Sequence, residues 1–139
     1  MTSHAISVTD RNMKAPTIKI FFDGGCRPNP GQMETAVVAR GITYHQPECG
    51  TGTNNDAEWL ALIHAAEIAL SIGARNVVML GDSALVVGQA SGRAKCRSPE
   101  FRAYFDEFRS LAKNFERIKI RKIPRTQNLA GIALAQARR

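Results

Sequence analysis

The stretch Ile18–Gly25, with the sequence IKIFFDGG, is an apolar run that ends in an aspartate and two glycines. Its isoleucine and phenylalanine content and its alternation predict a β-strand over residues 17–22. Glycine and proline interrupt regular structure, so the glycine pair and the following RPNPG segment, residues 27–31, predict a turn. Asp23 is therefore expected where a buried strand ends.

The rest of the chain alternates between strand and helix patterns. Further strands are expected over residues 35–40, 42–46, 77–80 and 118–123, and helices over residues 55–71, 83–90, from 99 onward, and 129–137. The first three strands are joined by short connections, which favour antiparallel pairing, and the later strand–helix–strand steps favour parallel pairing. We predict an α/β fold with a five-stranded mixed sheet and helices on both faces.

Length and composition indicate one domain. The 139 residues suffice for a single packed core, and the apolar share of 44% is ordinary for a globular protein. We expect residues 1–16 to form a flexible leader and residues 17–139 to form the domain. The sequence contains no apolar run of the roughly 20 residues that span a bilayer, and no signal peptide is recognisable. A cytoplasmic monomer with three reduced cysteines and no membrane partner is expected.

The net charge of +7 is unevenly distributed. Residues 92–139 hold 13 of the 19 Lys and Arg residues but only four of the 12 acidic ones. This asymmetry suits a polyanionic partner held by a basic face beside an acidic pocket. A solvated basic surface is the alternative explanation.

Three carboxylates stand out by their local sequences. Asp23 follows the first strand, Glu58 lies one turn into the first helix, and Asp82 follows the apolar run 77–81. Neighbouring parallel strands would bring these acids to one edge of the sheet, where their repulsion would favour a divalent cation. Each acid also has an ordinary explanation: a turn residue, a charge at a helix N-terminus, and a helix cap, respectively.

The flanks of these acids resemble the motifs of type 1 ribonuclease H. The matching segments are FDGGxxxNPG at 22–31, TNNxAE at 53–58 and GDSxLVV at 81–87, and the resemblance runs from about residue 18 to residue 135. The chain resembles a compact form of this family that lacks the basic protrusion, since only residues 92–97 separate the helix expected over residues 83–90 from the one expected from residue 99 onward. The resemblance implies the ribonuclease H-like fold, hydrolysis of the RNA strand of RNA–DNA hybrids, and two Mg²⁺ or Mn²⁺ ions.

The resemblance also implies roles for individual residues. Asp23, Glu58 and Asp82 would be the catalytic metal ligands, with Asp23 bridging both ions. The expected nucleic-acid contacts are Gly24, Cys26, Asn29 and Asn55 toward the RNA strand, Thr53 toward a phosphate of the DNA strand, and Arg93, Lys95, Arg97 and Arg125 toward phosphates generally. Helix capping remains an alternative for Thr53 and Asn55, and solvent exposure remains one for the four basic residues.

One position departs from the family pattern. The family has Asn-x-x-Ala-Asp-x-Leu-Ala near its C-terminus, and here residues 128–135 read NLAGIALA. Ile132 occupies the position of the fourth carboxylate, so one of the two ions is expected to be held weakly and activity to be reduced. The alternatives are a catalytically inactive paralogue that binds hybrid or other nucleic acid, and an interaction module that needs no metal.

Overall fold

The computed structural model describes residues 15–138. The expected leader therefore lies outside the described residues except for Ala15 and Pro16. The elements follow one another in the order β1 (Thr17–Cys26), β2 (Gly31–Ala39), β3 (Ile42–Gln46), β4 (Thr51–Gly52), α2 (Asn54–Ser71), β5 (Asn76–Gly81), α3 (Ala84–Ala90), α4 (Pro99–Ala112), β6 (Arg117–Lys122), the 3₁₀ turn η1 (Arg125–Gln127) and α5 (Leu129–Ala137).

The sheet confirms the predicted fold class. Its strand order is β3-β2-β1-β5-β6, and the short strand β4, which the sequence pattern did not indicate, pairs with β2. The first three strands are antiparallel, whereas β1–β5 and β5–β6 are parallel. No helix within residues 15–138 has the length and apolar character needed to cross a membrane.

The prediction that Gly24 and Gly25 begin a turn is wrong. Strand β1 continues through both glycines to Cys26, with Gly24 opposite Thr35 and Gly25 opposite Glu34 on β2. Glycine is required at position 24 because helix α2 approaches the strand closely there: a Cβ on Gly24 would lie 2.1 Å from the backbone oxygen of Ala57 in α2. A glycine inside a strand often marks such a close approach of another backbone.

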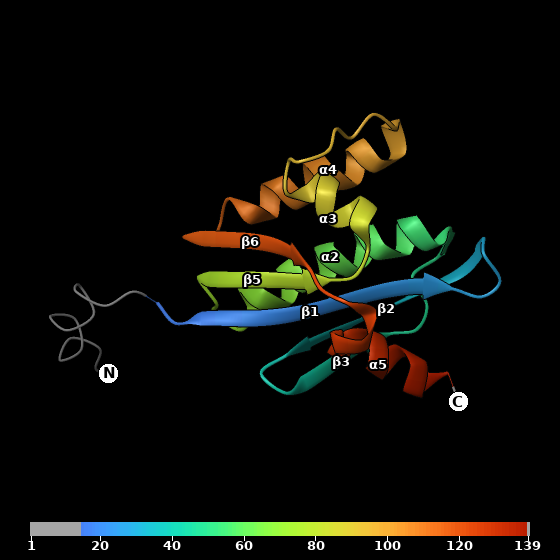
Figure 1. Ribbon diagram of the computed structural model, residues 1–139, viewed down its shortest axis with the longest axis horizontal. Helices are drawn as coiled ribbons and strands as arrows, with labels where there is room; N and C mark the ends of the chain where they lie inside the picture. The colour runs from blue at the N-terminus through green and yellow to red at the C-terminus, as the bar shows by residue number, and fades with distance from the viewer. Residues whose placement is uncertain (1–14, 139) are drawn as a thin grey trace, which may run out of the picture.

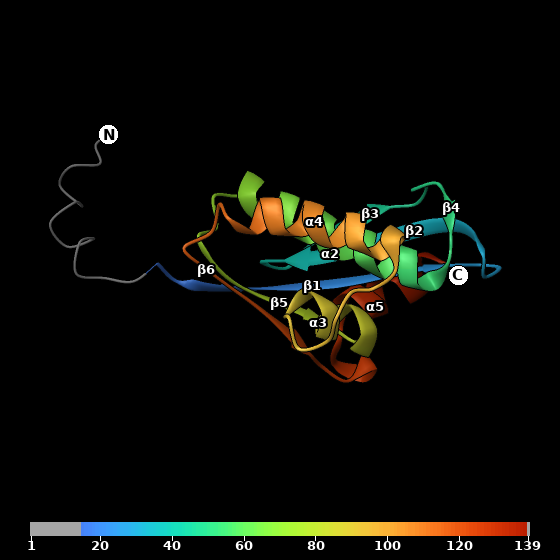
Figure 2. The same cartoon turned by 90° about the horizontal axis from the view of Figure 1, so that it is seen from above.

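Helices cover both faces of the sheet, as predicted (Figures 1 and 2). On one face, α2 packs against β1 and β2, with α4 stacked on α2. This layer encloses the main core, in which Ile20, Phe22 and Trp59 are fully buried. On the other face, α5 covers β1 and β2 with a smaller apolar cluster that includes Val38 and Leu134.

Candidate active site

The register of the parallel strands brings Asp23 and Asp82 together. Phe21 of β1 pairs with Leu80 of β5, so Asp23 and Asp82 both lie two residues further along, at the carboxyl end of β5. Asn128, which is fully buried, fixes this arrangement from the loop before α5. Its Nδ2 donates to the Oδ2 of Asp82 and to the backbone oxygen of Phe22, both at 3.0 Å.

Helix α2 supplies the third carboxylate. Thr53 caps the helix by accepting from the backbone N–H of Asp56, while the Asp56 carboxylate accepts from the N–H of Thr53. The capped first turn sets Glu58 against β1, where its Oε1 accepts a hydrogen bond of 3.1 Å from the N–H of Gly24. The close approach at Gly24 thus carries Glu58 into the site.

Asp23, Glu58 and Asp82, hereafter the acidic triad, each offer one oxygen, and these atoms lie within 4.8 Å of one another. Burial, and then the Asp82 carboxylate, raise the pKa of Asp23 to about 7. Burial, and then the Asp23 and Asp82 carboxylates, raise the pKa of Glu58 to about 9. Ionising all three carboxyl groups together is therefore unfavourable, and a bound divalent cation would offset the repulsion between them.

The donor set fits a hard divalent cation. Three carboxylates on separate elements provide the oxygen ligands that Mg²⁺ prefers, and Mg²⁺ retains waters at its other positions. The triad could thus hold one ion.

The triad opens into a cavity of about 550 Å³, hereafter the acid pocket. Four of the other sequence-predicted site residues line it, namely Gly24, Cys26, Asn55 and Arg125. Arg125 is exposed to solvent, yet its charge lowers the pKa of both Asp23 and Glu58, so exposure and proximity to the site coexist.

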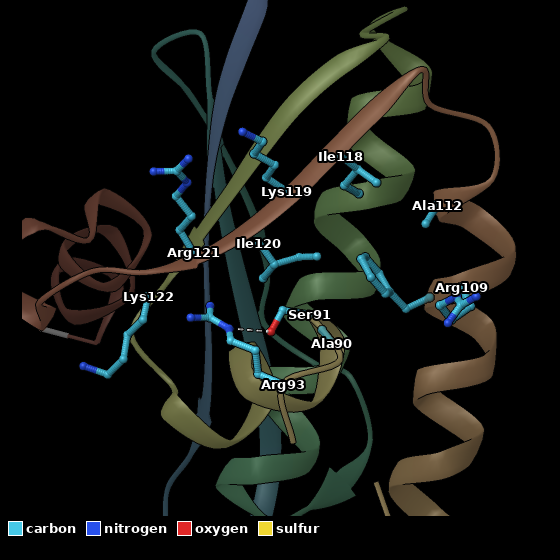
Figure 3. A pocket seen from close by; sticks show the side chains of 11 residues that line it. Ala90, Ser91, Arg93, Arg109, Ala112, Ile118, Lys119, Ile120, Arg121 and Lys122 are labelled. Carbon is cyan, nitrogen blue, oxygen red and sulfur yellow. Dashed lines mark hydrogen bonds between the residues drawn. The ribbon is translucent and has the colours of Figure 1, made fainter. Parts of the chain in front are cut away.

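Other predicted contacts do not line the acid pocket. Thr53 serves as the cap of α2, and the Oδ1 of Asn29 accepts from the backbone N–H of Asn54 at 3.1 Å. Lys95 and Arg97 line a separate hollow beside α4. Arg93 lies in a third cavity between α3, α4 and β6, where its Nε donates to the Oγ of Ser91 (Figure 3).

The first turns of α5 present Gly131 to the triad more directly than Ile132. A Cβ on Gly131 would lie 3.4 Å from the Oδ2 of Asp23. Residues 131, 134, 135 and 138 line the acid pocket, whereas Ile132 does not and is 43% exposed. An aspartate at position 132 would have to reach inward from the flank of this helical face.

Sequence reasoning missed Asn54 and Arg138 as site residues. The Oδ1 of Asn54 accepts from the backbone N–H of Cys26 at 3.0 Å, and both residues line the acid pocket. Arg138 follows Gly131 by seven residues, a helical spacing that places it on the same face of α5. That spacing was the available signal for Arg138, and it becomes informative only once Gly131 is known to face the triad.

A mixed sheet with carboxylates at the carboxyl end of β5 and on the covering helix defines a ribonuclease H-like domain. The chain belongs to the family described as "Reverse transcriptase-like", whose model matches residues 22–138. The resemblance to type 1 ribonuclease H is thereby confirmed.

Solved structures and curated proteins agree with this assignment. The chain is 31% identical to ribonuclease H1 of Halobacterium salinarum, with a TM-score of 0.80 over 86% of this chain and 94% of that one. It is also 31% identical to LC11-RNase H1, which was isolated from compost by a metagenomic approach. The structure of LC11-RNase H1 in complex with RNA/DNA hybrid matches with a TM-score of 0.75 over 84% of this chain and 92% of that one.

The bifunctional protein Rv2228c of Mycobacterium tuberculosis is 35% identical over 85% of this chain. The match spans only 34% of that protein's length.

Proposed function

We propose that this chain is a metal-dependent endoribonuclease that hydrolyses the RNA strand of RNA–DNA hybrids. The observation that carries the proposal is the acidic triad, with three carboxylate oxygens within 4.8 Å of one another in a solvent-open pocket. A solved relative supports RNA–DNA hybrid as the substrate, since LC11-RNase H1 forms a complex with RNA/DNA hybrid.

Asp23, Glu58 and Asp82 would hold Mg²⁺ or Mn²⁺. When bound, the metal would make the attacking water more acidic and offset negative charge on the phosphate. The protein's own contribution is to fix the triad: Gly24 holds Glu58 by its N–H, and Asn128 holds Asp82 by its side-chain amide. In the hydrolysis, the water oxygen forms a bond to phosphorus while the bond to the leaving ribose oxygen breaks, and that oxygen takes up a proton.

Two arginines add positive charge where the phosphate would lie. Arg125 and Arg138 both line the acid pocket, and both lower the pKa of Asp23. The Nε of Arg138 donates to the Oε2 of Glu34 at 2.7 Å, while the Oε1 of Glu34 is 3.0 Å from the Nε2 of His45. This chain of contacts anchors one side of the Arg138 guanidinium.

The other side of the Arg138 guanidinium lacks a protein partner. Its Nη2 is buried and has no hydrogen-bond partner within residues 15–138. A Cβ on Gly25 would lie 3.1 Å from this nitrogen, so the absence of a side chain at Gly25 makes room for it. A buried N–H without a partner is costly, and a phosphate oxygen entering the pocket would satisfy it after a small rotation of the guanidinium.

Ile132 supports a second candidate function, a catalytically inactive paralogue that binds hybrid. Without the fourth carboxylate, one of the family's two ions would be held weakly, and small misplacements are expensive in catalysis. The presence of two arginines in the acid pocket is compatible with either function, because the nuclease and the inactive paralogue would both bind phosphate groups.

A labelled RNA–DNA hybrid incubated with the protein in Mg²⁺, Mn²⁺ or EDTA tests the proposal. Cleavage that needs a divalent ion and disappears in Asp23→Asn supports it. Binding without cleavage, with cleavage gained in Ile132→Asp or Gly131→Asp, identifies the inactive paralogue. Two aspartate variants are needed because Gly131, rather than Ile132, faces Asp23. Metal-dependent cutting that persists in Asp23→Asn contradicts the site assignment.

A further inference from the structure

The cavity that contains Arg93 lies between the edge strand β6 and the helices α3 and α4 (Figure 3). Its volume is about 790 Å³. The floor is apolar, with Ile118 and Ile120 directed toward the helices in Figure 3. Three basic residues lie on the same side as these isoleucines, namely Arg93, Arg109 and Lys122, and we call this cavity the basic groove. The side chains of Lys119 and Arg121 alternate with the isoleucines and point away from the helices (Figure 3).

The charge of the basic groove is not balanced by the protein. Its lining contains no aspartate or glutamate. Within residues 15–138, the ion pairs involve His45, Arg75, Arg102 and Arg138, so none of the three groove cations takes part in one. Three cations without a carboxylate partner create a positive potential that attracts an anion carrying several charges.

The basic groove begins next to the acid pocket. Lys122, at the end of β6, pairs with Gly81, the residue before Asp82, and the N–H of Ile123 donates to the Gly81 oxygen. Neighbouring strands lie about 4.8 Å apart, so Lys122 is one strand spacing from the strand that ends at the triad. Arg93, after α3, and Arg109, on α4, line the same groove on the helix side. A nucleic-acid strand that leaves the acid pocket across β5 would therefore enter the groove.

The shape favours a single strand over a duplex. A stiff duplex keeps its bases stacked inside and cannot fill a groove with an apolar floor. A single strand can turn its bases or sugars onto such a floor and set its phosphates against the cationic rim. We propose that the basic groove binds the single-stranded flank of a nucleic acid whose hybrid part occupies the acid pocket. This inference rests on the proposed function and adds the preferred substrate form, a hybrid with an unpaired end.

The test compares a blunt hybrid with hybrids that carry a five-nucleotide overhang. The overhang is placed at each end of each strand, so that RNA and DNA flanks are separate arms. Affinity is measured by fluorescence anisotropy in EDTA at several salt concentrations, which makes the readout independent of cleavage. Each phosphate bound on a single strand adds about 0.7 to the slope of log K against log salt, so three contacts should add about 2.

One overhang should bind roughly tenfold more tightly than the blunt hybrid, with the steeper salt dependence given above. The variant R93Q/R109Q/K122Q should lose both the added affinity and the added slope. Arg75→Gln is the matched control, because Arg75 is ion-paired with Glu116 and lies outside the groove. The control should keep the ratio of overhang to blunt affinity.

Three results would overturn the inference. The first is equal affinity for blunt and overhang hybrids, and the second is an equal loss in Arg75→Gln. The third is displacement of the overhang by poly-glutamate of the same charge as readily as by single-stranded nucleic acid. Absence of cleavage in Mg²⁺ and Mn²⁺ would instead contradict the proposed function and leave the overhang ratio as a separate result.

Discussion

Replacing Asp23 with asparagine should stabilise the protein when no divalent ion is present. The pKa of Asp23 is raised from 3.8 to about 7, mainly by burial. The folded state therefore binds more protons than the unfolded state between about pH 4 and pH 7, and stability falls as the pH rises through that window. Asparagine has a similar shape and does not ionise, so it avoids this loss.

The shift sets the size of the effect. At about 1.4 kcal/mol per pKa unit, ionising Asp23 in the folded state would cost roughly 4 kcal/mol. Because the acid pocket is open to solvent, we halve this to about 2 kcal/mol. For a domain of this size, that corresponds to a melting temperature about 8 °C higher for Asp23→Asn at pH 8, with almost no difference at pH 4.

Thermal unfolding in EDTA, followed by circular dichroism from pH 4 to pH 9, measures this difference. Asp106→Asn is the matched control, because it makes the same chemical change on the exposed surface of α4. Adding Mg²⁺ should stabilise the wild type and narrow its gap to Asp23→Asn. A gap that does not depend on pH, or the same pH-dependent gain in Asp106→Asn, would contradict ionisation of the buried Asp23 as the cause.

Three further variants test the packing at Gly24, the hydrogen bonds of Asn128 and the phosphate contact proposed for Arg138. Gly24→Ala should cost about 3 kcal/mol in urea unfolding, because its Cβ would overlap the Ala57 oxygen, whereas Gly88→Ala in helix α3 has room and serves as the control. Asn128→Ala should cost about 2–4 kcal/mol by leaving the Phe22 carbonyl unpaired in the core, and should weaken Mg²⁺-induced stabilisation by freeing Asp82. Arg138→Met should weaken hybrid binding about tenfold, an effect that would vanish on a hybrid with a neutral methylphosphonate at the contacted position; equal losses on both hybrids would contradict a phosphate contact.

Most of the fold could be predicted from the periodicity of apolar residues in strands and helices. The strand over residues 42–46 and the final helix over residues 129–137 match the structure end to end. The extension of β1 through Gly24 and Gly25 was not predictable in this way, because local chemistry assigns glycine to turns. The reason for the extension is the backbone of α2, 34 residues away at Glu58, and no local pattern reports such a contact.

The site divides in the same manner. The triad could be located because each acid sits at the end of a recognisable element, and element order predicts which ends meet. Arg138 could not be assigned, because its position depends on Glu34 across the sheet and on the space at Gly25. The groove cations were visible only as excess charge, since their convergence requires the loop after α3 to lie beside β6.

Strand β6 ends the sheet, and its outer backbone groups have no partner strand within residues 15–138. Such an edge can pair with the edge of another molecule and start aggregation, and lysines on the edge oppose this. Lys119 and Arg121 alternate with Ile118 and Ile120 along β6, so two copies aligned edge to edge would bring like charges together. Neutralising these cations should therefore reduce solubility, and variants of β6 need to be compared at low protein concentration.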